Sequence, residues 1–332
     1  RKEMKKLFLV LFVLMAFATS VFANGASEAA APADKWPERT ITLVVTANTG
    51  GDVDQVARLL APELTKELGV NVVVQNMGGN GGNQAVQHVL TSDADGYTFI
   101  IFNGMYYTGL IAGKFQQSMD DGLEIACTAA KSDTQVLVVD AKSDITTAAK
   151  MAEKIKNEPN TVKFAATLGS PSQFHAVATE NAMGGKFKKV DVASGSDKLV
   201  ALLSGEVNVV SSTQSLVKDY VAQGKIAIVG SICAERSSFF PETATFKDQG
   251  YDLGPDFAAT YMLMAKKGTD QAFLDKFGEA VKRVMEKPEA RQLFENLYYS
   301  PAVRVGDEAK AWKQEAFGLF EGMREAIVND KW

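Results

Sequence analysis

The chain has little of what most catalytic and metal sites need. It holds two histidines and two cysteines among 332 residues, and no cluster of Cys, His and Asp has metal-ligand spacing. No Gly-x-Ser-x-Gly segment surrounds Ser170 or Ser172, so the signature of a serine hydrolase is missing. The glycines at 79–82 have the wrong spacing for a dinucleotide loop. The sequence therefore points away from an enzyme, and we expect no cofactor and no metal.

An excess of positive charge is also absent. Lys and Arg number 35 against 40 Asp and Glu, which gives a net charge of −5. This balance offers no basic footprint for nucleic acid and no polybasic patch for a membrane surface. No second long apolar run follows the N-terminal one, so we expect a soluble mature protein.

The N-terminal segment has the charged, apolar and small-residue order of a secretory signal peptide. Lys5 and Lys6 precede an apolar run at 7–17 that is too short to span a bilayer, and Val21-Phe22-Ala23 follows. We expect a signal peptide at 1–23, cleaved after about Ala23, a flexible leader at 24–35 and a periplasmic mature protein. A buried helix or an uncleaved anchor is the alternative.

The two cysteines, Cys127 and Cys233, fit two interpretations. An oxidising compartment permits a disulfide between them. Both also fit apolar strand positions, and the sequence does not place them within the ~6 Å Cα separation that a disulfide requires.

Short β-branched runs alternate with helical periodicity along the chain. Strands are predicted at 41–46, 70–74, 97–102, 135–139, 162–166, 190–192, 207–210 and 226–232, and the chain is predicted to be mostly helical from residue 270, including 273–286 and 307–327. The βαβαβ order predicts an α/β fold with a parallel sheet and helices on both faces. Two such units followed by helices predict two lobes, with the C-terminal helical region packed on the first lobe.

Two predicted loops, at 46–54 and 167–173, each join the end of a strand to the start of a helix. Ligands of open α/β sheets bind at such ends, where free N–H groups and the helix dipole favour anions. Gly50 and Gly51 allow close approach of the backbone, and Ser170 and Ser172 add hydroxyl groups. Glycine turns and serine caps also precede many helices without a ligand, so the recurrence in two units is what favours binding.

The two histidines differ in their position relative to these loops. His175 follows the second loop and fits either a ligand contact or a role on a helix face. His88 lies in a run of small and apolar residues, where a structural or surface role fits better.

Several segments occur in an order that is typical of one receptor family. They are Trp-Pro-Glu-Arg-Thr-Ile-Thr-Leu-Val-Val at 36–45, Gly50-Gly51-x-x-Asp54, Asn76-x-x-Gly79-x-Gly81-Gly82-Asn83, Asp95-Gly96-Tyr97-Thr98, Ala-Leu-Leu-x-Gly-x-Val at 201–207 and Ala-Glu-Arg-Ser at 234–237. Together they resemble the substrate-binding receptors of tripartite tricarboxylate transporters, the TctC or Bug family, over nearly the whole mature chain.

The resemblance implies a two-lobed periplasmic-binding-protein fold of the Venus-flytrap, type II-like kind. We expect lobe 1 at 36–125 plus 233–332, lobe 2 at 126–232, and hinge strands near 125–130 and 226–233. The lobes would close over a small organic acid, either a di- or tricarboxylate or an acidic or zwitterionic solute. The receptor would be a monomer that delivers this solute to a membrane permease. A sensory input protein for a membrane kinase, or an exported enzyme, is the alternative.

The resemblance also suggests candidate ligand-binding residues by position. They are Ala47, Asn48, Thr49, Gly50, Gly51, Asp54, Asn103, Tyr106, Gly169, Ser170, Ser172, Gln173, His175 and Ser194.

Two departures from the family pattern affect the expected ligand. Asp52 stands where the family has glycine or another small residue, and we expect it to be a solvent-facing helix cap. Alternatively, it repels a ligand carboxylate or meets an amine, which would favour a zwitterion. Ala193-Ser194-Gly195 replaces the family's Tyr-Lys-Gly or Tyr-Arg-Gly and so removes an aromatic ring and a cation.

Overall fold

A computed structural model describes residues 35–78, 82–113, 122–192 and 194–330. The predicted signal peptide, most of the leader, residues 79–81 and Ala193 lie outside the described residues. Residues 37–332 form one compact unit, to which the following description applies. In the described part of the chain, no helix combines the length and apolarity needed to cross a bilayer.

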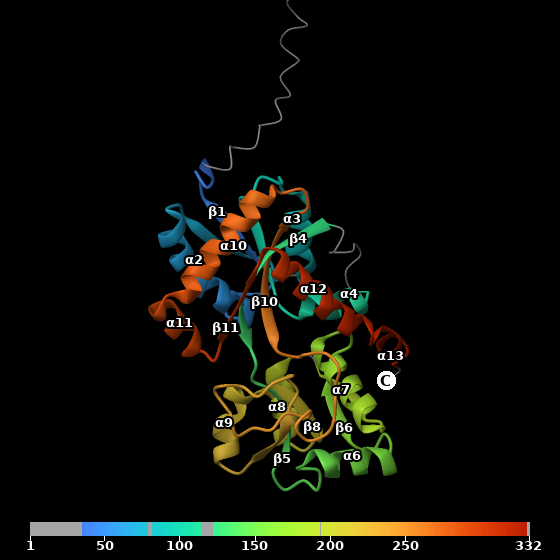
Figure 1. The fold of residues 1–332 in the computed structure, drawn as a ribbon. Coiled ribbons are helices and arrows are strands. Elements are labelled where there is room, and N and C mark those ends of the chain that lie inside the picture. Colours follow the sequence, from blue (N-terminus) through green and yellow to red (C-terminus); the bar gives the residue numbers. More distant parts are fainter. Residues whose placement is uncertain (1–34, 79–81, 114–121, 193, 331–332) are drawn as a thin grey trace, which may run out of the picture. The chain divides into compact units, whose positions relative to one another are not determined.

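The first sheet has six strands in the order β11-β4-β10-β3-β1-β2. Figure 1 labels β1, β4, β10 and β11 of this sheet. Their bounds are β1 Ile41–Val45, β2 Val72–Asn76, β3 Thr98–Phe102, β4 Leu123–Ser132, β10 Ala259–Lys266 and β11 Ser300–Val305. Strand β1 pairs in parallel with β2 and β3, as predicted. Strands β10 and β11 run antiparallel to their neighbours, so the sheet extends beyond the predicted parallel unit and is mixed. The cause is that β10 and β11 come from the C-terminal part of the chain and do not follow a βαβ crossover.

Helices from both ends of the chain pack on this first sheet. They are α2 Asp52–Leu68, α3 Asn83–Thr91, α10 Gln271–Glu286, α11 Pro288–Glu295 and α12 Gly306–Glu321, while α4 Met105–Ile111 packs on α12 and α13 Arg324–Val328 follows α12. Helix α10 packs on β4, β11 and α2, and α12 packs on β4, α4 and β11. The rings of Phe99 in β3 and Phe277 in α10 stack with their centroids 3.8 Å apart. The C-terminal helices α10 and α12 therefore pack on the first sheet, as predicted.

Helix α2 shows how the sequence sets these elements. Its buried residues Val53, Val56, Leu60 and Leu64 recur at helical spacing, and they form the stripe that faces the sheet. The helix ends at Gly69, whose φ of 73° is a left-handed conformation that glycine adopts without strain.

The second sheet has five strands in the order β7-β6-β8-β5-β9. Its strands are β5 Gln135–Asp140, β6 Lys163–Ala166, β7 Lys188–Asp191, β8 Val209–Thr213 and β9 Ile226–Ser231, and its helices are α6 Ala148–Asn157, α7 Pro171–Met183, α8 Gly195–Leu203 and α9 Gln214–Ala222. Strand β6 is parallel to β7 and β8, whereas β5 is antiparallel to β8 and β9. This sheet is also mixed.

The C-terminal region differs from the predicted helical tail in two places. Residues 300–305 form strand β11, which completes one edge of the first sheet. The helix predicted at 307–327 is divided into α12 and α13 near Gly322 and Met323. Helix α13 then contacts α7, which belongs to the second sheet's unit.

The two cysteines are both free and buried. Cys127 lies in β4, and Cys233 follows β9. Burial raises the pKa of both thiols, that of Cys233 to about 12, so neither thiol is poised to ionise. Of the two interpretations of these cysteines, the structure supports buried apolar positions.

Candidate functional site

A cavity lies where the N-termini of helices that follow strands of the two sheets meet. Its volume of about 480 Å³ is within the usual range for small-molecule sites. The first sheet's unit contributes Asp52, Asn103, Gly104, Tyr107 and Thr108, and the second contributes Gln135, Pro171 and His175. The remaining lining comes from Ala234, most of the segment 254–260, and Trp312, Glu315, Ala316, Leu319 and Phe320 on α12.

The position of the cavity follows from the topology. Asp52 begins the helix after β1, Asn103 directly follows β3, and Pro171 begins the helix after β6. Carboxyl ends of strands from both sheets therefore face one hollow, which is where open α/β sheets bind ligands.

The first predicted loop holds its own backbone in place. The Gly50 N–H donates to Oδ2 of Asp54 at 2.8 Å, and the Gly51 N–H donates to the Asn48 carbonyl at 3.1 Å. Asp54 also accepts from Arg58 Nε at 2.9 Å and Asn76 Nδ2 at 2.8 Å. Burial opposes ionisation of Asp54, but the bonds from Arg58, Gly50 and Asn76 outweigh it and lower the pKa of this carboxyl.

The second predicted loop is held in the same way. The Gly169 N–H donates to Oε1 of Gln173 at 2.7 Å, so in both loops a side chain four residues later holds a glycine N–H. The Ser172 hydroxyl accepts from the Thr167 N–H at 3.0 Å and from Lys198 Nζ at 2.9 Å, and it lies 2.8 Å from the Ser170 hydroxyl.

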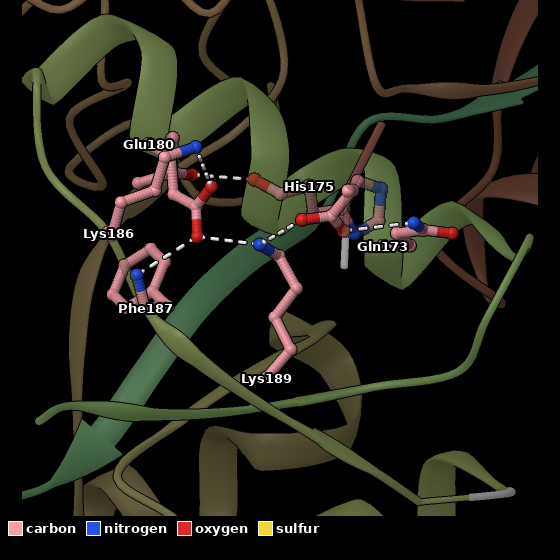
Figure 2. Close-up of polar contacts among 8 residues, drawn as sticks. Gln173, His175, Glu180, Lys186, Phe187 and Lys189 are labelled. Atoms are coloured by element: carbon pink, nitrogen blue, oxygen red, sulfur yellow. Dashed lines mark hydrogen bonds and ion pairs between the residues drawn. The ribbon is translucent and has the colours of Figure 1, made fainter. Parts of the chain in front are cut away.

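The second loop is also joined to Asp330 near the C-terminal end of the described residues. Figure 2 shows the polar contacts around Gln173, Glu180 and Lys189. Nε2 of Gln173 donates to Oδ2 of Asp330 at 2.9 Å. Nζ of Lys189 lies 2.7 Å from Oδ1 of Asp330 and 2.7 Å from Oε1 of Glu180. The side chains of Lys189, Glu180 and Asp330 are 4%, 0% and 7% exposed, so this ion-pair chain is buried.

Asp52 is exposed, as predicted, but its side chain does not cap the helix, whose N-cap residue is Gly51. Its Oδ2 accepts from Asn103 Nδ2 at 2.8 Å and from the Tyr261 hydroxyl at 3.0 Å, and the residue lines the cavity. Burial, and then the charge of Asp52, raise the pKa of Tyr261 and that of Tyr299, the latter to about 12. Both phenols therefore stay neutral beside the Asp52 carboxylate.

His175 lines the cavity from α7 and is buried, with 6% of its surface exposed. Its Nδ1 has no hydrogen-bond partner among the described residues. The Phe257 ring packs edge-on against the imidazole with centroids 4.8 Å apart. Burial, with a smaller effect of the Lys198 charge, lowers the pKa of His175 from 6.5 to about 3. The imidazole is therefore neutral, with one ring nitrogen able to donate and the other able to accept.

The buried His175 predicts an acid sensitivity of the fold. The unfolded chain binds a proton at this residue below about pH 6.5, whereas the folded chain does so only near pH 3. The contribution of His175 to the free energy of unfolding is therefore fully present above pH 6.5 and is lost as the pH falls towards 3. We expect His175 to lower the free energy of unfolding by about 2 kcal/mol between pH 8 and pH 5. Denaturant unfolding at both pH values should show that His175→Gln removes this difference.

His88 provides the matched control for that measurement, because it is exposed on α3. His88→Gln should leave the pH dependence unchanged. Equal pH dependence in the wild type and His175→Gln would contradict the assignment.

Of the predicted ligand-binding residues, Asn103 and His175 line the cavity. The first-loop residues Ala47, Asn48, Thr49, Gly50, Gly51 and Asp54 and the second-loop residues Gly169, Ser170, Ser172 and Gln173 lie beside it, outside the lining. Tyr106 is fully buried in the core, and Ser194 caps α8 by accepting from the Asp197 N–H at 3.1 Å. Their roles in binding remain predictions.

The lining residues that sequence reasoning missed come mostly from α12 and the segment 254–260. On α12, Trp312, Ala316 and Phe320 recur every four residues, which places them on one helix face. That spacing is visible in the sequence, but it does not reveal which cavity the face lines.

Comparisons with known sequences find related proteins. Residues 56–315 match the tripartite tricarboxylate transporter family receptor. The chain is 31% identical over 280 residues to the "UPF0065 protein in gbd 5'region" of Cupriavidus necator, covering 84% of each chain.

Solved structures show the same fold at low identity. A TctC solute binding protein from Polaromonas, with no ligand, has a TM-score of 0.74 at 19% identity, over 89% of this chain and 99% of that one. MatC from Rhodopseudomonas palustris with bound malate has a TM-score of 0.68 at 22% identity, over 89% and 100% of the two chains. The fold is thus the two-lobed α/β fold of periplasmic binding proteins, as the sequence predicts. This chain belongs to the tripartite tricarboxylate transporter family of receptors.

Proposed function

We propose that this protein is a periplasmic receptor that captures a small carboxylate-bearing solute and delivers it, unchanged, to a membrane permease. The observation that carries the proposal is the cavity of about 480 Å³ between the strand ends of the two sheets. Its size suits a solute of a few carbon atoms, and a similar structure holds malate.

The start of α7 is the part of the cavity that best suits a carboxylate. Pro171 is at the first turn of this helix and lines the cavity with His175. The helix dipole favours negative charge at this end, and the neutral imidazole supplies a donor. Lys198, which donates to Ser172 in the same turn, adds positive charge behind the wall.

Capture is expected to depend on relative motion of the two lobes. We propose that lobe 1, at 36–125 plus 233–332, and lobe 2, at 126–232, close as a monomer about strands near 125–130 and 226–233. A ligand that binds only the closed form stabilises that form by mass action, with no bond made or broken.

A thermal-shift screen tests this function. The chain from residue 35 onward is mixed with organic acids, amino acids and neutral sugars, and hits are measured by calorimetry. We expect at least one carboxylate-bearing solute to bind. At a free solute concentration of one hundred times its Kd, it should raise the free energy of unfolding by about 2.7 kcal/mol. Binding of neutral sugars alone, or turnover of a bound acid, would overturn the proposal.

A further inference from the structure

The lining of the cavity carries negative charge. Asp52, Asp256 and Glu315 line it, and no Lys or Arg is present among its described lining residues. Two cations contact residues at or next to the lining without lining the cavity themselves: Lys198 donates to Ser172, and the Arg304 guanidinium carbon lies 5.2 Å from the Trp312 ring centroid. A solute with two or three carboxylates would bring like charges against this wall.

Aromatic rings share this lining with the carboxylates. Tyr107, Phe257, Trp312 and Phe320 line the cavity, and the rings of Tyr107 and Phe320 stack 5.4 Å apart. Aromatic faces and carboxylates together attract a cationic group, because both present negative potential to it.

Asp52 has an oxygen available for such a group. Both of its hydrogen bonds, from Asn103 and Tyr261, go to Oδ2, and Oδ1 has no partner among the described residues. The two donors fix the carboxylate in place. An ammonium group at Oδ1 would form a charge-assisted hydrogen bond.

His175 is an independent sign of a ligand in the same cavity. Only 6% of its surface is exposed, and it lines the cavity. Its Nδ1 has no hydrogen-bond partner among the residues that the structure describes. A buried polar atom without a partner costs free energy, so it is rarely kept unless something binds to it. As a donor at the start of α7, the imidazole suits a carboxylate.

We propose that the cavity selects a zwitterionic solute, whose ammonium group binds Asp52 and whose carboxylate binds His175 and the start of α7. This selectivity rests on the proposed receptor function and narrows its ligand class. A dicarboxylate of the same length is disfavoured, because its second carboxylate would meet Asp52.

A five-carbon series tests the selectivity by calorimetry on the chain from residue 35 onward. The probes are pentanoate, glutarate, norvaline, 5-aminopentanoate and cadaverine, which differ in the charged groups that they carry. We expect norvaline or 5-aminopentanoate to bind at least about tenfold more tightly than glutarate, pentanoate and cadaverine. This comparison needs no variant.

Asp52→Asn removes the charge and keeps the shape. We expect it to weaken the better zwitterion at least about tenfold and to leave glutarate equal or tighter. Glu308→Gln removes one exposed charge from α12 outside the cavity and should change neither affinity. Tighter binding of glutarate than of both zwitterions, or a loss below threefold in Asp52→Asn, overturns the inference.

The two proposals fail in different ways. If other carboxylates of the screen bind and neither zwitterion does, the selectivity is wrong and the receptor function stands. If no carboxylate-bearing solute binds, both are wrong.

Discussion

Lys189→Met is expected to lower the free energy of unfolding by about 3 kcal/mol. The Lys189 ammonium bridges two buried carboxylates, Glu180 and Asp330, at 2.7 Å each. Methionine fills a similar volume but leaves the Asp330 carboxylate without this cation. We place the loss at the lower end of the range for broken buried pairs, because Glu180 keeps Lys186 and the Phe187 N–H. Chemical denaturation at neutral pH measures the difference.

Lys186→Met is the matched control, because Lys186 contacts the same Glu180 at 2.8 Å while its side chain is 57% exposed. We expect a loss of about 0–1 kcal/mol, as for exposed ion pairs. In a background of Lys189→Met, Asp330→Asn should cost less than it does in the wild type, because the two residues are coupled. Equal losses of unfolding free energy in Lys189→Met and Lys186→Met would show that burial of the ion-pair chain adds nothing to the stability of the fold.

The consequence of this ion-pair chain extends to the second loop. Asp330 holds Nε2 of Gln173, and Oε1 of Gln173 holds the Gly169 N–H. The end of the chain therefore fixes a loop that lies beside the cavity. No local sequence pattern predicts this contact, because it joins residues 157 positions apart.

The strand and helix pattern was predictable where local rules apply. β1 is buried along nearly its whole length and is followed by an amphipathic helix, so its βαβ unit is visible in the sequence. β10 and β11 were not predicted. They join the first sheet from remote parts of the chain, and pairing between distant strands leaves no local periodicity.

The candidate site was predictable only in part, for a similar reason. Asn103 directly follows β3, and His175 lies in the second turn of the helix after β6, so topology places both near a ligand. The glycine N–H groups of the two loops were expected to be free, but Asp54 and Gln173 accept from them. Asp52 is exposed as expected, but its contact with Tyr261, 209 positions away, has no local signal in the sequence.

Ala316→Phe is expected to block the cavity. Ala316 lies on the face of α12 that lines it, is partly buried, and would place a phenyl ring in the space for the solute. We expect an affinity loss of at least about 100-fold, equivalent to about 2.7 kcal/mol. Ala311→Phe adds the same ring at an exposed position of the same helix and should leave binding unchanged.

The most direct test of the central claim is a calorimetric titration of the best-binding carboxylate-bearing solute into the wild type, Ala316→Phe and Ala311→Phe. We expect one solute per chain in the wild type and Ala311→Phe, and at least about a 100-fold weaker affinity in Ala316→Phe with its folding unchanged. Equal binding by all three proteins would place the solute outside this cavity and contradict the account.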